Sequence, residues 1–303
     1  MDGVRHGVRR RWAVVAVLAA VLGVVGWGPV QPVPKVAAAP VTPVSPMRVA
    51  YGSQPDMFGD LYLPPRRSGS AEKCPVVVLF HGGGWLRYLS LRQFAAHASE
   101  LADAGVAVWN VEYRRVNGGG GYPTTLTDAD AAVGALSTVV QRRAGGRLDL
   151  DQVHLAGHSA GGQLAAWTAG RRTAGVSAGQ GVRIRSLTLM ASVLDMGYAA
   201  SHGRDPFVPK LLGGTPETVP DRYRFASPID NLPRDIHITA VQGTADRLVS
   251  VQQTSRYMAA AGRANRIETH ILPGVGHTPF TDVHSPAWAT AREAILAQVR
   301  GKV

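Results

Sequence analysis

Cysteine is almost absent from this sequence of 303 residues, which contains only Cys74. With a single thiol, the chain forms no intrachain disulfide and no cysteine-rich zinc or iron–sulfur site. The sequence also lacks H-E-x-x-H or any comparable histidine and carboxylate pattern at metal-ligand spacing. We therefore expect a fold that is stabilised by packing and that uses no metal or other cofactor.

Long basic segments are missing too, although the formal net charge is +11. The basic residues are scattered singly or in pairs, without the aromatic-interleaved patch that is typical of nucleic-acid binding. The glycines at 118–121 lack the spacing of a dinucleotide loop, and no Gly-Lys-Ser/Thr follows them. The charge therefore predicts a solvated, arginine-rich surface and no nucleic-acid partner.

The first 38 residues have the pattern of a targeting segment. Arginines precede an apolar run from Ala13 to Gly26, which fits a secretory signal and is short for a membrane-spanning helix. Val36-Ala37-Ala38 predicts cleavage after Ala38, and residues 39–46 form a proline-rich linker. An uncleaved signal anchor is the alternative. We expect a secreted or extracytoplasmic protein, or a membrane-anchored one if the leader is uncleaved.

Residues 47–303 alternate short apolar runs with amphipathic segments, which predicts strands alternating with helices in one α/β domain. Strands are predicted at 47–51, 58–63, 75–80, 106–111, 153–156, 184–191 and 238–242, and one more ends before 273. Helices are predicted at 91–104 and 125–143, and a third follows the strand at 153–156 and ends at about 171. The first two strands are expected to be antiparallel and the others to form a mostly parallel sheet with helices on both faces.

One segment at the end of a predicted strand, Gly157-His158-Ser159-Ala160-Gly161, matches the G-x-S-x-G nucleophile elbow. In that motif the glycines permit a tight turn that exposes a serine hydroxyl above the end of the sheet. The five residues alone also fit an ordinary glycine turn. A catalytic interpretation therefore requires a base, an acid and an oxyanion hole elsewhere in the chain.

A glycine-rich loop, His81-Gly82-Gly83-Gly84-Trp85, directly follows the strand predicted at 75–80. Glycines at this position allow backbone N–H groups to approach a developing negative charge closely. The N–H groups of Gly83 and Gly84, together with that of Ala160 after the nucleophile, are therefore predicted to form an oxyanion hole.

The predicted acid and base come later in the chain. Asp246 follows the strand at 238–242, and His277 lies on a loop after the last strand. The chain order Ser159, Asp246, His277 is the order of α/β-hydrolases. An acid at the end of a strand is suited to orient the histidine that takes the proton from the serine.

Other polar residues compete for these roles. Asp195 and Asp230 are alternative acids, although neither directly follows a clear strand. His158 is predicted to point away from the serine and to pack, and His81 to brace the glycine loop. The segment 192–233 lacks clear periodicity and is interpreted either as a small lid that walls the substrate pocket or as a surface loop.

Together, the four catalytic segments resemble an α/β-hydrolase of the bacterial esterase/lipase type. Leu211-Leu212-Gly213-Gly214-Thr215-Pro216, with Arg222-Tyr223 and Ala226-Ser227-Pro228-Ile229 after it, is similar to the branch of feruloyl- and acetyl-esterase-like enzymes and kynurenine formamidase. The resemblance covers the chain from about Met47 and implies a serine carboxylic-ester hydrolase that acts through an acyl-enzyme on small or polysaccharide-linked esters. An amide-cleaving formamidase or peptidase and a non-catalytic binding module are the alternatives.

Overall fold

A computed structural model describes residues 45–65, 73–175, 181–203 and 206–301 of the chain. The predicted leader at 1–38 and most of the predicted linker at 39–46 lie outside these residues. The division of the chain at residue 46 therefore stays a prediction. Within the described ranges, no helix has the length and apolar character needed to cross a membrane.

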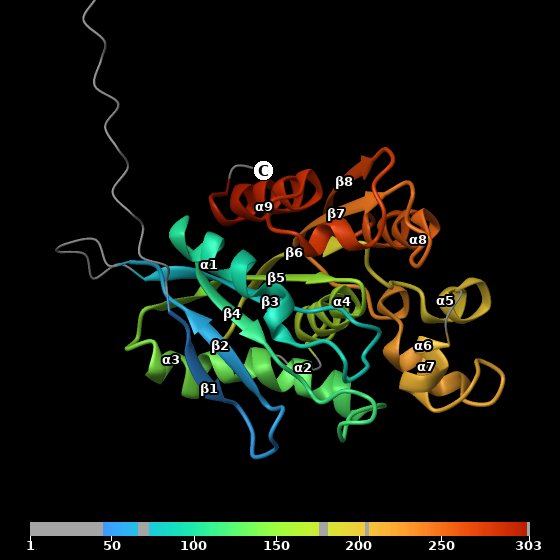
Figure 1. Cartoon of the computed structure of the whole chain (residues 1–303), viewed down its shortest axis with the longest axis horizontal. Helices are drawn as coiled ribbons and strands as arrows, with labels where there is room; N and C mark the ends of the chain where they lie inside the picture. The colour runs from blue at the N-terminus through green and yellow to red at the C-terminus, as the bar shows by residue number, and fades with distance from the viewer. Residues whose placement is uncertain (1–44, 66–72, 176–180, 204–205, 302–303) are drawn as a thin grey trace, which may run out of the picture. The chain divides into compact units, whose positions relative to one another are not determined.

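The described residues form a central eight-stranded sheet, in the order β1-β2-β4-β3-β5-β6-β7-β8 (Figure 1). The strands are β1 (Met47–Ala50), β2 (Phe58–Tyr62), β3 (Cys74–Phe80), β4 (Ala107–Val111), β5 (Leu148–His158), β6 (Ile184–Met190), β7 (His237–Gly243) and β8 (Arg266–Leu272). β2 is antiparallel to both of its neighbours, and the other pairs are parallel. The predicted fold, a mostly parallel sheet opened by an antiparallel pair, is confirmed.

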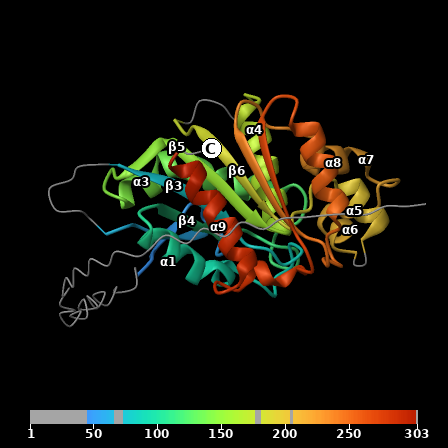
Figure 2. The same cartoon turned by 90° about the horizontal axis from the view of Figure 1, so that it is seen from above.

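Helices cover both faces of this sheet (Figure 2). They are α1 (Ala95–Asp103), α2 (Thr124–Gly134), α3 (Val139–Arg143), α4 (Ala160–Thr173), α5 (Met196–His202), α6 (Phe207–Leu212), α7 (Pro220–Ala226), α8 (Val251–Ala261) and α9 (Pro286–Val299). Along β3, Val77 and Leu79 pack with residues of α1 and α9, whereas Val76 and Val78 pack with residues of α2 and α4. This alternation explains why β3 reads as a continuous apolar run.

Two segments differ from the sequence prediction. The helix expected over 125–143 is interrupted, because Thr138 has φ −125° and ψ −101°, and a 3-10 turn at Ala135–Ser137 separates α2 from α3. The segment 192–233, which has no clear periodicity, contains three short α-helices in its described residues, α5 to α7. Helices of six or seven residues are too short to show a repeating apolar face.

The topology brings the predicted catalytic segments to one edge of the sheet. β3, β5, β7 and β8 are parallel, and their carboxyl ends lead to the glycine loop, to Ser159, to Asp246 and to His277. In open α/β sheets, ligands bind outside the carboxyl ends of the strands. Four segments that are far apart in the sequence are therefore close together in space.

We expect Gly161→Ala to destabilise the fold, because α4 begins against the end of β3. A Cβ atom on Gly161 would lie 2.2 Å from the carbonyl oxygen of Phe80 and 2.4 Å from that of His81. Such overpacking against backbone costs about 1–3 kcal/mol of unfolding free energy. Urea unfolding measures it, with Gly197→Ala in α5 as the control, since the nearest atom there is 3.6 Å away. Equal stabilities of the two variants would contradict the prediction.

Buried histidines make the fold sensitive to acid. Burial is the main cause that lowers the pKa of His97 and His154 to about 4 and that of His158 to about 3. Because histidine has a pKa of about 6.5 in an unfolded chain, the unfolded state binds more protons than the folded state in this range. The contribution to stability is therefore complete above about pH 6.5 and is lost as the pH falls toward 4.

Replacing His97 by leucine is expected to reduce this acid sensitivity. The ring of His97 packs edge-on against Phe94 and Trp288, with centroids 4.7 and 4.5 Å apart, and it does not line the pocket described below. Urea unfolding between pH 5 and 6 should show the slope of unfolding free energy against pH reduced by about 1.4 kcal/mol per pH unit, one proton. A slope equal to that of the wild type, measured in the same buffers, would contradict the prediction.

Candidate active site

Ser159 occupies the tight turn between β5 and α4. Its backbone has φ 55° and ψ −119°, a conformation that is uncommon and strained for a residue with a side chain. The tight turn requires glycine at both flanking positions, because a Cβ on Gly157 would lie 2.4 Å from the carbonyl carbon of Gly161, and a Cβ on Gly161 would lie 2.2 Å from the carbonyl oxygen of Phe80. The N–H of Ser159 donates to the carbonyl of Met190 at 2.9 Å, which fixes the turn to β6.

His277 and Asp246 are in direct contact. Nδ1 of His277 lies 2.8 Å from Oδ2 of Asp246, whose side chain is fully buried. The other carboxylate oxygen accepts the N–H groups of Leu248 and Val249, each at 2.9 Å, and the Gln242 amide donates to Oδ2 at 3.2 Å. This set of donors holds the carboxylate in one orientation toward the histidine.

Electrostatics keep this carboxylate ionised. Burial alone would raise the pKa of Asp246, but the hydrogen bond and the charge of His277 and the N–H groups of Val249 and Leu248 outweigh it. The pKa of Asp246 therefore lies below its ordinary value. An ionised carboxylate on Nδ1 fixes the tautomer in which Nε2 of the ring is free to accept a proton.

The glycine loop has an unusual backbone over three successive residues. Gly83, Gly84 and Trp85 have φ values of 110°, 60° and 58°, so two of the three need the conformational freedom of glycine. Within the described part of the chain, the N–H groups of Gly83, Gly84 and Ala160 have no hydrogen-bond acceptor. They are therefore available to a ligand in the pocket that all three residues line.

A buried ionic cluster holds the base of this loop. His81 contacts Glu112 through Nε2 at 2.9 Å and the carbonyl of Gly82 through Nδ1 at 2.8 Å. Arg115 lies 3.3 Å from the same carboxylate, and Tyr113 stacks on His81 while its hydroxyl donates to the His81 carbonyl. Burial opposes ionisation of Glu112, but its hydrogen bond with His81 and the charges of His81 and Arg115 lower its pKa.

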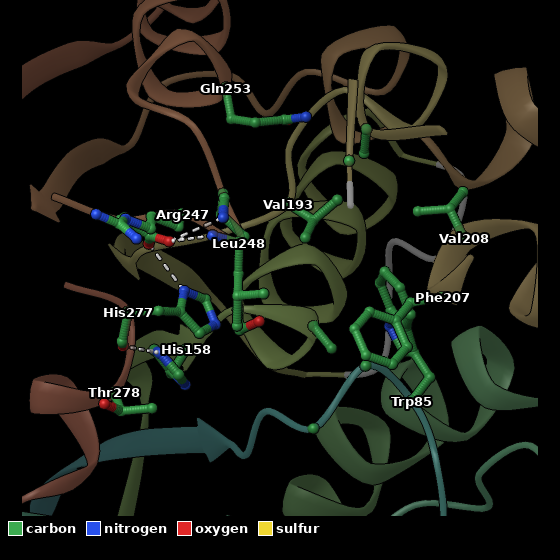
Figure 3. A pocket seen from close by; sticks show the side chains of 18 of the residues that line it. Trp85, His158, Val193, Phe207, Val208, Arg247, Leu248, Gln253, His277 and Thr278 are labelled. Atoms are coloured by element: carbon green, nitrogen blue, oxygen red, sulfur yellow. Dashed lines mark hydrogen bonds and ion pairs between the residues drawn. The ribbon is translucent and has the colours of Figure 1, made fainter. Parts of the chain in front are cut away.

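A pocket of about 350 Å³ lies beside these groups (Figure 3). Ser159 and His277 both line it, and Phe207 and Val208 lie across the pocket from His277. Its lining residues are Gly83, Gly84, Trp85, Tyr88, Leu89, Gln93, His158, Ser159, Ala160, Val193, Tyr198, Ala199, His202, Gly203, Phe207, Val208, Asp246–Ser250, Gln253, His277, Thr278 and Thr281. Concave sites of this size and largely apolar lining are typical of small-molecule binding.

Comparison with known proteins gives the family. The model of the BD-FAE family, whose members are α/β-hydrolase esterases, matches residues 59–260, which contain the glycine loop, the elbow and Asp246. The chain belongs to the BD-FAE family. The protein is accordingly a serine hydrolase with carboxylesterase activity, and the predicted resemblance to bacterial esterases is confirmed.

Solved structures with the same fold include several esterases. A truncated carbohydrate esterase from gut microbiota is 20% identical, with a TM-score of 0.72 over 86% of this chain and 99% of that chain. Thermogutta terrifontis esterase 2 phosphonylated by sarin is 20% identical (TM-score 0.67; 82% and 92% covered), and an inhibited esterase B from Lactobacillus rhamnosis is 21% identical (TM-score 0.67; 84% and 85% covered). No curated protein sequence matches the chain.

In this BD-FAE domain, the six predicted site residues all line the same pocket: Gly83, Gly84, Ser159, Ala160, Asp246 and His277. Their catalytic roles stay predictions. The structure separates the alternative acids from the site. Asp195 caps α5 by accepting the N–H of Tyr198 and pairs with Arg256 at 2.8 Å, and Asp230 belongs to a 3-10 helix at Pro228–Asp230.

His158 plays a larger part in this BD-FAE site than the sequence suggests. It is buried, as expected, but it also lines the pocket, and its Nε2–H donates to the carbonyl of His277 at 3.0 Å. The two rings are 4.6 Å apart between centroids. Burial and the charge of His277 lower the pKa of His158 to about 3, so it stays neutral and supports His277 without competing for protons.

The prediction that the segment 192–233 walls the pocket is confirmed for part of the segment. α5 contributes Tyr198, Ala199 and His202 to the lining, and α6 contributes Phe207 and Val208. Other apolar residues of the segment, among them Met196, Leu211 and Leu212, are instead buried in the core of the domain. The sequence also gave no signal for Gln93, which lines the pocket and accepts the N–H of Gly82 at 2.9 Å.

Proposed function

We propose that the protein cleaves carboxylic esters through an acyl-enzyme on Ser159, and that its substrates are small or polysaccharide-linked esters outside the cytoplasm. The observation that carries this proposal is the 2.8 Å contact between His277 and Asp246, which line the same pocket as Ser159. The positive φ of Ser159 supports the same role, because backbone strain of this kind occurs where a structure exposes a reactive side chain.

In the first half of the reaction, Nε2 of His277 takes the proton of the Ser159 hydroxyl while the serine oxygen bonds to the ester carbonyl carbon. The carbonyl oxygen becomes an oxyanion that accepts hydrogen bonds from the N–H groups of Gly83, Gly84 and Ala160. One such donor lowers the barrier by about 2.7–4 kcal/mol. His277 then gives the proton to the leaving alcohol oxygen as the ester C–O bond breaks.

The second half returns the enzyme to its starting state. A water molecule gives a proton to His277, and its oxygen bonds to the acyl carbon. The carbonyl oxygen becomes an oxyanion again and accepts hydrogen bonds from the same three N–H groups. The bond to Ser159 breaks, the serine oxygen takes the proton back from His277, and the carboxylic acid leaves. Asp246 stays ionised throughout and stabilises the positive charge on His277 in both halves.

The substrate proposal rests on the pocket and on the family. Tyr88, Tyr198 and Phe207 give the pocket aromatic walls beside the apolar Val193 and Leu248. A volume of about 350 Å³ accommodates a small acyl group together with part of a sugar. The similar structure of a carbohydrate esterase from gut microbiota supports a polysaccharide-linked ester as the natural substrate. The arginine-containing, apolar leader supports export of the protein.

Labelling and a substrate panel test the proposal. A fluorophosphonate probe should add one adduct per chain, and peptide mapping should place it on Ser159. Initial rates should then be measured on p-nitrophenyl acetate and butyrate, methyl ferulate, acetylated xylo-oligosaccharide and the matched amides. We expect turnover of esters and much slower turnover of amides. Labelling at another residue contradicts the acyl-enzyme at Ser159, and faster cleavage of the amides favours the formamidase or peptidase alternative.

A further inference from the structure

β8 is an edge strand of the sheet, and two of its isoleucines have exposed side chains on the same face. Among the strands of the described residues it pairs only with β7, and Figure 1 shows it as the last strand at that end. Ile267 and Ile271 are each 42% exposed, which makes them two of the four most exposed large apolar side chains in the described part of the chain. An unpaired edge with apolar side chains is a template for another strand.

The backbone polarity of β8 is fixed by its bonds to β7. The N–H of Arg266 donates to Ile236, and the carbonyl of Leu272 accepts from Thr244, so even-numbered residues of β8 bond toward β7. In a parallel ladder, the residues between them direct both N–H and C=O away from the neighbour. Ile267, Thr269 and Ile271 therefore present three donors and three acceptors along the free edge.

We propose that β8 pairs antiparallel with β8 of a second copy of this chain, about a two-fold axis at Thr269. In this register Thr269 faces Thr269 of the partner subunit, and Ile267 on each chain faces Ile271 on the other. Each of these three pairs exchanges two hydrogen bonds, so all six outward-directed groups of each edge are used. The apolar side chains of Ile267 and Ile271 then cover each other on one face of the joined sheet.

The polar residues of β8 select the same register. Glu268 and His270 alternate with the isoleucines on the other face, and they contact each other within one chain at 3.1 Å. A two-fold axis at Thr269 places Glu268 of each chain directly opposite His270 of the other, as a carboxylate facing a donor. A shift of the axis by one residue places Glu268 opposite its own copy or His270 opposite its own copy. Two facing Glu268 carboxylates repel each other, and two facing His270 rings lack the carboxylate acceptor.

The ends of the strand limit the pairing to this centre. Pro273 follows β8 and has no N–H, so an axis moved to Ile271 would place Thr269 opposite a residue that cannot donate. An axis at Ile267 would leave Ile271 without a partner inside the strand. The sequence Ile267-Glu268-Thr269-His270-Ile271 is thus self-complementary about its central residue, as an isologous two-fold contact requires.

Sedimentation equilibrium of the purified full chain over a concentration series tests this interface. We expect a monomer–dimer equilibrium in the wild type. Thr269→Pro removes one outward N–H at the axis, a change that edge strands tolerate when the N–H faces solvent, and it should give a monomer. Glu268→Lys should weaken the dimer about tenfold, because two symmetric pairs are lost.

Three controls make the result specific. Combining Glu268→Lys with His270→Glu reverses the facing pair and should restore the dimer. Glu217→Lys makes the same charge change at an exposed turn outside β8 and should leave the dimer constant unchanged. Circular dichroism of each variant verifies that it is folded. A monomeric wild type overturns the proposal, and so does a dimer that Thr269→Pro and Glu268→Lys leave intact, because such a dimer forms elsewhere on the chain.

Discussion

Ser159→Ala is expected to lower kcat for a p-nitrophenyl ester by about six orders of magnitude. The serine oxygen is the atom that forms the covalent bond in the proposed reaction, and alanine offers no substitute for it. The backbone of the turn is held independently of the hydroxyl, by Gly157, Gly161 and the hydrogen bond from the Ser159 N–H to Met190. The loss should therefore appear in kcat while the protein remains folded.

Steady-state kinetics on p-nitrophenyl acetate measures this effect, with thermal unfolding as the test of folding. Ser250→Ala is the matched control, because Ser250 lines the same pocket but caps α8 by accepting the N–H of Gln252. The control should cost about 1 kcal/mol of stability and leave kcat within a few-fold. If Ser159→Ala kept the activity of the wild type, the nucleophile would be another residue.

Asp246→Asn is expected to lower kcat by about four orders of magnitude. The carboxylate accepts hydrogen bonds from His277, Gln242, Leu248 and Val249, so every partner is a donor. An asparagine NH2 group would face one of these donors, or would force His277 into the tautomer with its proton on Nε2. That tautomer cannot take the proton of the serine hydroxyl.

Asp195→Asn is the control for this variant. Asp195 is one of the alternative acids that the sequence leaves open, and it is bound to Arg256 and to the N-terminus of α5 instead of to a histidine. Its replacement should change kcat little. The comparison is measured at several pH values on the same ester, and a larger loss of kcat for Asp195→Asn than for Asp246→Asn would refute the assignment of the acid.

Local sequence signals predicted the sheet well. The continuous apolar run at 75–80 and the alternation of strands with helices are properties of neighbouring residues, and β3, β4 and β7 lie within a few residues of where the sequence places them. The interruption between α2 and α3 was missed, because apolar residues recur at helical spacing across it, at Leu126, Ala129, Val133, Leu136 and Val140. A residue whose φ and ψ lie outside the helical range interrupts a helix, and the amino-acid pattern of the segment does not reveal those angles.

Contacts between distant segments were less predictable. The contact between Asp246 and His277 was predicted from their order in the chain, whereas the support of His277 by His158, which joins residues 119 apart, was not. The cluster of His81, Glu112 and Arg115 at the base of the glycine loop is of the same kind. No periodicity or motif within one segment indicates which side chain of another segment it will meet.

The sequence by itself determined the elbow at Ser159, the glycines at 83 and 84 and the order of the candidate acid and base, because tight turns and close backbone approach demand particular residues at fixed spacing. Only the tertiary structure placed Asp246 against His277 and Asp195 against Arg256, and turned α5 and α6 into a wall of the pocket. The physical reason is that hydrogen-bond partners and cavity walls are set by the packing of parallel strands side by side. That packing joins the carboxyl ends of β3, β5, β7 and β8 at one edge of the sheet.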